Sequence, residues 1–174
     1  MNKPLLVAYA TKHGSTHEVA DAVAVRLRER GLEAEVRSAR GVATLAPYDG
    51  VVIGGALYMG RWHSDARRFL SHHRDELAVL PLAVFAMGPP VFAMGPLTLK
   101  DEDVADSRKQ LDHALAKEPR LEPVTVAIFG GVVNPAKQHF PFTYVATSDA
   151  RDWDEIRSWA DSVAALSMPA AAAV

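Results

Sequence analysis

Apolar and polar side chains follow one another along this chain in blocks that predict strands and helices in turn. Short apolar runs typical of buried parallel strands cover residues 5–10, 50–55, 82–87 and 124–129. Residues 32–37 alternate between apolar and polar side chains, which indicates an edge strand with one wet face. Apolar side chains at helical spacing predict helices over residues 15–30, 64–77, 101–117 and 152–166. This alternation favours an α/β fold in which helices cover both faces of a parallel sheet.

The predicted order of elements also locates a ligand site. We expect one doubly wound domain over residues 1–168, followed by a flexible tail over 169–174. Ligands of such folds bind outside the carboxyl ends of the strands. Three predicted strands run into glycines there, at Gly54-Gly55, at Gly88 and at Gly130-Gly131. Glycine lets a flat ligand approach the backbone closely.

The first strand–helix connection is rich in hydroxyl groups. Thr11, Ser15 and Thr16 surround Gly14 where the predicted helix begins. Free backbone N–H groups and the positive end of the helix dipole meet at this point, which suits a phosphate group. An ordinary connection with a Ser or Thr N-cap is the alternative. The candidate phosphate ligands are Thr11, Lys12, His13, Gly14, Ser15 and Thr16.

A loop with large side chains is predicted after the 50–55 strand. Its residues are Ala56, Leu57, Tyr58, Met59, Gly60, Arg61, Trp62 and His63. Loops usually expose such side chains to water, so their presence calls for a reason. One reason would be a planar ligand on which Tyr58, Met59 and Trp62 stack. The other would be packing of the loop on itself or against a second subunit. With the phosphate turn, this loop predicts a mononucleotide site; the candidate ring contacts are Ala56, Leu57, Tyr58, Met59, Gly60 and Trp62.

A short duplication lies in the middle of the chain. Residues 84–89, Val-Phe-Ala-Met-Gly-Pro, are repeated as residues 91–96. We expect the first copy to form the strand and the second to lengthen the following loop, although identical copies leave the reverse assignment open. Met87, Gly88 and Pro89 are candidates to border the planar ligand, as are Gly130 and Gly131.

Composition removes several classes of function. The 174 residues include no cysteine, which excludes disulfides, thiolate metal sites and a cysteine nucleophile. The net charge of −2 gives no indication of nucleic-acid binding. His13 and His17 lack a third ligand nearby in sequence, so no metal site is expected. His72 and His73 are expected on a wet helix face.

No signal peptide and no transmembrane segment are expected, and the predicted location is cytoplasmic. Because no Ser/His/Asp set or carboxylate pair is evident, any redox or transfer chemistry would come from a cofactor.

Three segments of the chain resemble a known family. Residues 11–16, Thr-Lys-His-Gly-Ser-Thr, look like the phosphate-binding loop of flavodoxins. Residues 49–64 and the Asp152-Trp153 pair resemble the flavodoxin-domain family that includes the menaquinone-dependent protoporphyrinogen dehydrogenases. The resemblance implies a flavodoxin-like, three-layer α/β/α fold with a five-stranded parallel sheet in the order 2-1-3-4-5. It also implies one bound FMN and redox chemistry.

The resemblance sets the functional expectation. It implies an FMN-dependent oxidoreductase linked to a porphyrinogen or a quinone. A non-catalytic electron carrier that docks on another protein, or a binding domain without FMN, are the alternatives. His63 is the candidate catalytic residue, which would stabilise reduced flavin or transfer a proton; capping of the following helix is its other reading. We further expect a homodimer in which exposed Trp62 or Phe142 of one subunit covers the flavin of the other. Peripheral contact with a membrane is also expected.

Overall fold

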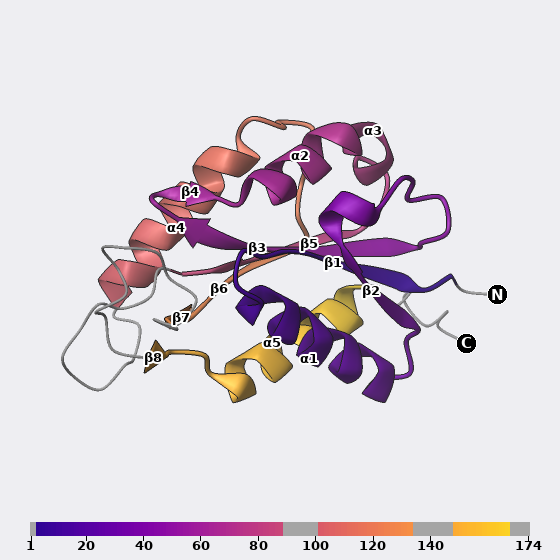
Figure 1. Cartoon of the computed structure of the whole chain (residues 1–174). Coiled ribbons are helices and arrows are strands. Elements are labelled where there is room, and N and C mark those ends of the chain that lie inside the picture. The colour runs from indigo at the N-terminus through magenta and orange to yellow at the C-terminus, as the bar shows by residue number, and fades with distance from the viewer. Residues whose placement is uncertain (1–2, 89–100, 134–147, 168–174) are drawn as a thin grey trace.

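The strands of the central sheet lie in the order β2-β1-β3-β5-β6, and all four neighbouring pairs are parallel. The computed structural model describes residues 3–88, 101–133 and 148–167 (Figure 1). The strands are β1 (Leu5–Ala10), β2 (Ala34–Ser38), β3 (Gly50–Tyr58), β5 (Leu82–Met87) and β6 (Thr125–Phe129). Two antiparallel additions follow: β4 (Arg61–Trp62) pairs with β3, and β7 (Val132–Val133) pairs with β8 (Ser148–Asp149).

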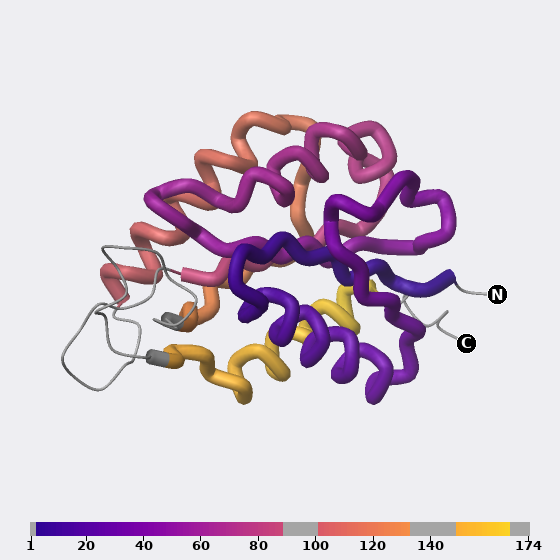
Figure 2. The backbone as a smooth tube through the Cα atoms, viewed as in Figure 1, coloured from indigo at the N-terminus to yellow at the C-terminus, as the bar shows by residue number. Residues whose placement is uncertain are grey.

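Helices form a layer on each face of the sheet (Figure 1). One layer holds α1 (Ser15–Glu29) and α5 (Trp153–Ser167). The other holds α2 (Ser64–His72), α3 (Arg74–Leu77) and α4 (Asp101–Leu115), while a short 3-10 helix, η1, covers Ala39–Gly41. Figure 2 shows the first and last helices side by side, and Asp161 of α5 joins Arg26 and Arg30 of α1 there.

The period of two along each buried strand divides the apolar core between these layers. Leu6, Ile53 and Val84 belong to the core on the α2–α4 side. Their chain neighbours Val7 and Phe85 belong to the core on the α1–α5 side. Both faces of the inner strands are therefore dry, which explains their continuous apolar runs.

The predicted architecture is confirmed, with β4 as an addition that was not expected. The first copy of the duplicated segment forms β5, as predicted. The predicted strand over 50–55 was too short, because β3 continues through Tyr58 into a hairpin. The predicted helix over 64–77 is interrupted at His73.

Two burial predictions were wrong. His73 is only 3% exposed, and its ring nitrogens lie 2.9 Å from Glu76 Oε2 and 3.2 Å from the Val42 carbonyl oxygen. Trp62 is 1% exposed, so it cannot be the exposed dimer contact that the sequence suggested. The predicted second copy at 91–96, Pro89, Phe142 and the tail at 169–174 lie outside the described residues.

Candidate functional site

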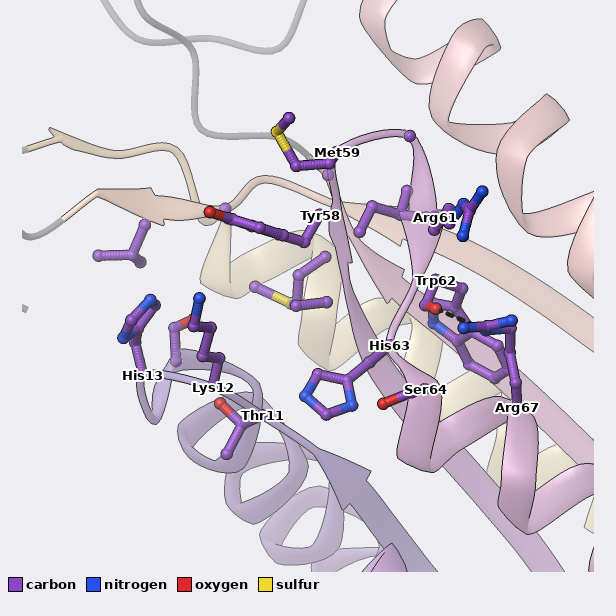
Figure 3. Close-up of a pocket in the computed structure, with 18 residues that line it drawn as sticks. Thr11, Lys12, His13, Tyr58, Met59, Arg61, Trp62, His63, Ser64 and Arg67 are labelled. Carbon is purple, nitrogen blue, oxygen red and sulfur yellow. Dashed lines mark hydrogen bonds between the residues drawn. The ribbon is translucent and has the colours of Figure 1, made fainter. Parts of the chain in front are cut away.

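A cavity of about 460 Å³ lies at the carboxyl ends of β1, β3 and β5 (Figure 3). Its wall comes from the β1–α1 loop, the β3–β4 hairpin with the start of α2, the end of β5 and the residues after β6. The lining residues are Thr11, Lys12, His13, Ser15, Ala56, Leu57, Tyr58, Met59, Gly60, Arg61, Trp62, His63, Ser64, Arg67, Met87, Gly88, Gly131 and Val132.

The β1–α1 loop turns sharply into its helix at Gly14. Gly14 has φ +98°, a left-handed conformation that side chains disfavour, and its N–H donates to Thr11 Oγ1 at 2.8 Å. Among the residues that the structure describes, no side chain caps the N-terminus of α1. The backbone N–H groups of the first turn are therefore available to an anion, with the helix dipole in the favourable direction.

Thr16 supplies the clearest indication that this loop holds a ligand. The residue is 0% exposed, and its Oγ1 has no hydrogen-bond partner among the described residues. A buried hydroxyl without a partner costs about 1–3 kcal/mol. An acceptor such as a phosphate oxygen would remove that cost, so the loop fits a phosphate group.

A two-residue turn joins β3 to β4. Tyr58 pairs with Arg61 across the hairpin, and Met59 and Gly60 between them have φ values of 50° and 74°. Positive φ at both central positions is typical of a type I′ turn, which prefers Asn-Gly. Met59 is thus a non-glycine residue held in a strained conformation, and its side chain is 78% exposed at the rim of the cavity.

Lys12 and Tyr58 face each other across the cavity. The Lys12 ammonium lies 4.6 Å from the centroid of the Tyr58 ring, which is within cation–π range. Tyr58 is 44% exposed, so a planar ligand can reach its ring. This contact brings the phosphate-type loop and the aromatic hairpin to one site.

His63 lies where it can both cap α2 and contact a ligand in the cavity. It is the N-cap residue of α2, where its Nδ1 accepts the Asp65 N–H at 3.2 Å. That bond leaves the proton of the neutral ring on Nε2, and the ring points toward Thr11 and Lys12 (Figure 3). Burial lowers the pKa of His63 below its usual value, and nearby Arg40, Arg67 and Lys12 lower it further, while Asp65 opposes them.

Hydrogen bonds from Trp62 and Arg67 stabilise the part of the cavity wall formed by β3, β4 and α2. Trp62 Nε1 donates to the Gly55 carbonyl oxygen at 3.0 Å, and Arg67 Nε donates to the Trp62 carbonyl oxygen at 3.0 Å. The wall is therefore held by hydrogen bonds that connect α2, β4 and β3. The buried indole packs in the core as well as lining the cavity, as its 1% exposure indicates.

The cavity gathers most of the residues that the sequence selected. Gly14, Thr16 and Gly130 lie beside its lining residues in the chain but are not part of the lining, and Pro89 is outside the described residues. Sequence reasoning missed Arg61, Ser64, Arg67 and Val132. Arg61 directly precedes Trp62 and Ser64 directly follows His63 in the chain, and this adjacency to predicted site residues was the available signal.

Residues 3–88, 101–133 and 148–167 contain no group of three or more His, Asp or Glu side chains placed to hold a metal ion. Within the same ranges, no helix combines the length and apolar character needed to cross a bilayer.

Comparison with known proteins gives a family match over most of the chain. The family model described as "Flavodoxin domain" matches residues 6–140. Protoporphyrinogen IX dehydrogenase (quinone) of Escherichia coli strain K12 is 31% identical over 84 residues, which are 47% of this chain and 46% of that enzyme. The match therefore spans about half the length of this curated relative.

Solved structures agree with the fold. A flavodoxin from Pseudomonas aeruginosa has a TM-score of 0.57 at 16% identity and covers 93% of this chain and 97% of its own. Oxidised flavodoxin 2 from Bacillus cereus has a TM-score of 0.54 at 20% identity, with 94% and 99% covered. Rubredoxin oxygen:oxidoreductase from Desulfovibrio gigas has a TM-score of 0.60 at 14% identity, with 95% and 37% covered. These likenesses show the fold.

Proposed function

Because this chain belongs to the flavodoxin domain family, we propose that it is an FMN-dependent oxidoreductase that exchanges electrons with a small organic molecule of the porphyrinogen or quinone type. The family match makes FMN the cofactor. The likeness of 84 residues to protoporphyrinogen IX dehydrogenase (quinone) supports the choice of substrate class. A location in the cytoplasm is part of the proposal.

The cavity that brings the β1–α1 loop and the β3–β4 hairpin together is the observation that carries this proposal. Thr11, Ser15, Thr16 and the first N–H groups of α1 would hold the phosphate of FMN. Tyr58 and Met59, together with the lining residues Met87, Gly88 and Gly131, would border its ring. FMN, when bound, supplies reversible electron transfer, which no side chain of this site provides.

The protein's own part in the reaction is positioning and proton handling. The strained Met59-Gly60 turn and the Trp62–Gly55 bond fix the shape of the hairpin before a ligand arrives. His63 Nδ1 accepts a hydrogen bond from the Asp65 N–H, and Nε2 is on the side of the ring that faces the cavity (Figure 3). Its Nε2–H would donate a hydrogen bond to a group bound there, whereas donation of a proton would require the protonated ring, in which Nδ1 no longer accepts from the Asp65 N–H.

The first test is an absorbance spectrum of the purified protein before and after addition of FMN and desalting. Flavin bands that remain after desalting are expected, because the phosphate loop and the hairpin bind opposite ends of one molecule. The loaded protein is then assayed anaerobically with a porphyrinogen as electron donor and with quinones as acceptors. Absence of retained flavin under several conditions would overturn the proposal and favour a binding domain without cofactor.

Turnover of a small-molecule substrate would distinguish an oxidoreductase from an electron carrier. Retained flavin without reduction of any quinone, together with rapid electron exchange with a reductase protein, would contradict the small-molecule substrate and favour the electron carrier. We also propose that the protein forms a homodimer, and that buried Trp62 is not one of its contacts. A monomeric sedimentation profile of the loaded protein at micromolar concentration would argue against that part.

A further inference from the structure

Cationic side chains line the cavity without any carboxylate beside them in its described lining. Lys12, Arg61 and Arg67 are among the lining residues, and none of the residues in that lining is Asp or Glu. The whole chain has a net charge of −2, so this concentration of positive charge does not follow from the overall composition. Positive clefts with low-dielectric walls raise the local concentration of anionic ligands.

The Arg67 side chain is held in a position from which it can donate hydrogen bonds to an anion. Its side chain is partly buried on the first turns of α2, and its Nε is occupied by the Trp62 carbonyl oxygen at 3.0 Å. Trp62 is itself fixed by the bond from Nε1 to Gly55. The two terminal nitrogens of the Arg67 guanidinium have no hydrogen-bond partner within the described residues. Such a fork matches a carboxylate in two-point geometry.

Arg61 adds a second guanidinium to the same wall. It lies on β4 opposite Tyr58, it is exposed, and it makes no ion pair in the part of the chain that the structure describes. Elsewhere the arginines are commonly neutralised, as Arg26 and Arg30 are by Asp161. Arg61 and Arg67 thus line the cavity without an ion pair to any described residue.

These two guanidinium groups lie apart from the predicted phosphate loop. Figure 3 shows Thr11, Lys12 and His13 on one side of the β3–β4 hairpin and Arg61 and Arg67 on the other. Positive charge reaches His63 from both sides, since Lys12 and Arg67 both lower its pKa. A single phosphate at the β1–α1 loop would leave the guanidinium pair free for another anion.

We propose that Arg61 and Arg67 form an anion-recognition site that selects redox substrates carrying a carboxylate. This inference rests on the proposed function and goes beyond it, because it assigns specificity to two residues and favours an acidic substrate over a neutral quinone. The guanidinium pair orients the substrate by its carboxylate and leaves the reacting part of the molecule toward the hairpin and His63.

The test measures binding to the FMN-loaded protein by equilibrium dialysis with two probes of nearly equal shape. Anthraquinone-2-carboxylate is anionic, and 2-(hydroxymethyl)anthraquinone is neutral. We expect the anionic probe to bind about tenfold more tightly, since a charge-assisted bidentate contact is stronger than a neutral one. The preference should shrink as sodium chloride screens the charges. In a double variant, Arg61→Gln with Arg67→Gln, the two probes should bind within about twofold of each other.

The matched control is Arg74→Gln. Arg74 is an exposed arginine of α3 whose side chain makes no hydrogen bond or ion pair with the described residues, and it is not part of the cavity lining. This variant loses the same charge and should keep the full preference. Equal binding of both probes to the unaltered protein, or an unchanged preference in the double variant, would overturn the proposal.

Flavin content separates this inference from the proposed function. Loss of FMN retention in the double variant alone would place the two guanidinium groups on the cofactor and overturn the anion site. Absence of FMN in the unaltered protein would instead overturn the proposed function. A preference of that flavin-free protein for the anionic probe that depends on Arg61 and Arg67 would still support the anion site.

Discussion

Thr16 illustrates how one residue can indicate a ligand that is not itself visible. Its hydroxyl is fully buried on the first turn of α1 and has no partner among the described residues. A folded protein tolerates such a cost where a functional site requires it. The same atom therefore makes opposite contributions to stability with and without a bound phosphate.

A Thr16→Val substitution should separate these contributions. Valine keeps the shape and removes the unpaired hydroxyl, so the free energy of unfolding without FMN should rise by about 1 kcal/mol. Retention of FMN should fall, because a donor to its phosphate is lost. Denaturant unfolding and flavin absorbance measure the two effects. Ser162→Ala, at an exposed position of α5, is the control, and a less stable flavin-free Val variant would contradict the argument.

His63 predicts a pH dependence whose sign follows from its lowered pKa. Burial makes the folded protein bind a proton at His63 less readily than the unfolded chain, whose histidine has its ordinary pKa of about 6.5. The unfolded state therefore binds more protons between the folded-state pKa and pH 6.5. This contribution to stability is full above pH 6.5 and is lost as the pH falls through the folded-state pKa.

A comparison with His63→Asn isolates that effect. Asparagine also caps helix N-termini, so α2 should persist while the titrating group disappears. Unfolding free energies measured from pH 5 to pH 8 should decline less toward low pH in the variant than in the unaltered protein. An NMR titration should give His63 a pKa below 6.5. Identical pH profiles for the two proteins would refute the assignment.

At the scale of elements, the β3–β4 hairpin decides the shape of the site. β3 pairs with β1 through Gly55 and with β5 through Ala56, and its last two residues, Leu57 and Tyr58, pair with β4 instead. The turn between β3 and β4 forces positive φ on Met59. A methionine there is less favourable than the asparagine that this turn type prefers, so the proposed contact of its side chain with FMN is testable by substitution.

Replacement of Met59 by Asn should stabilise the protein and weaken its function. Asparagine tolerates the left-handed conformation, so the free energy of unfolding should rise by about 0.5–1 kcal/mol. Little packing is lost, since Met59 is 78% exposed. Affinity for FMN, measured by flavin fluorescence, should fall if the methionine borders the ring. A destabilised Asn variant would show that the turn is not strained.

At the scale of the whole molecule, the sheet and the α1–α5 layer meet around Phe85. Its ring lies 5.7 Å from the Phe129 ring and 5.8 Å from the Trp159 ring, so it joins β5, β6 and α5. The space over Gly54 on the neighbouring β3 is filled by this ring. A Cβ added at Gly54 would lie 1.9 Å from Phe85 Cζ. Gly54 is therefore a packing residue, and the close approach is to a side chain rather than to a ligand.

A Gly54→Ala substitution should thus destabilise the protein by at least about 2 kcal/mol in thermal or denaturant unfolding, because the ring cannot yield without disturbing its neighbours. Gly41→Ala is the control, since a Cβ there meets nothing within 4 Å. In a double-mutant cycle with Phe85→Leu, the combined cost should be smaller than the sum. Additive costs would show that the two residues are not coupled.

The sequence by itself determined the alternation of strands and helices and the hydroxyl-rich turn at residues 11–16. Both are local patterns, because the spacing of apolar residues indicates the secondary structure and hydroxyls beside Gly14 indicate a helix N-terminus. The order of the strands was expected from the family resemblance, since right-handed crossovers limit the possible orders without selecting one.

Only the tertiary structure decided what is buried and what faces the cavity. Trp62 and His73 looked exposed because their neighbours in sequence are polar, yet Gly55 and Val42 from other elements supply their hydrogen-bond partners. Arg61 and Arg67 were not among the predicted site residues, and the fold placed both in one cavity whose described lining contains no carboxylate. Burial and pairing depend on residues distant in the chain, and periodicity carries no information about those contacts.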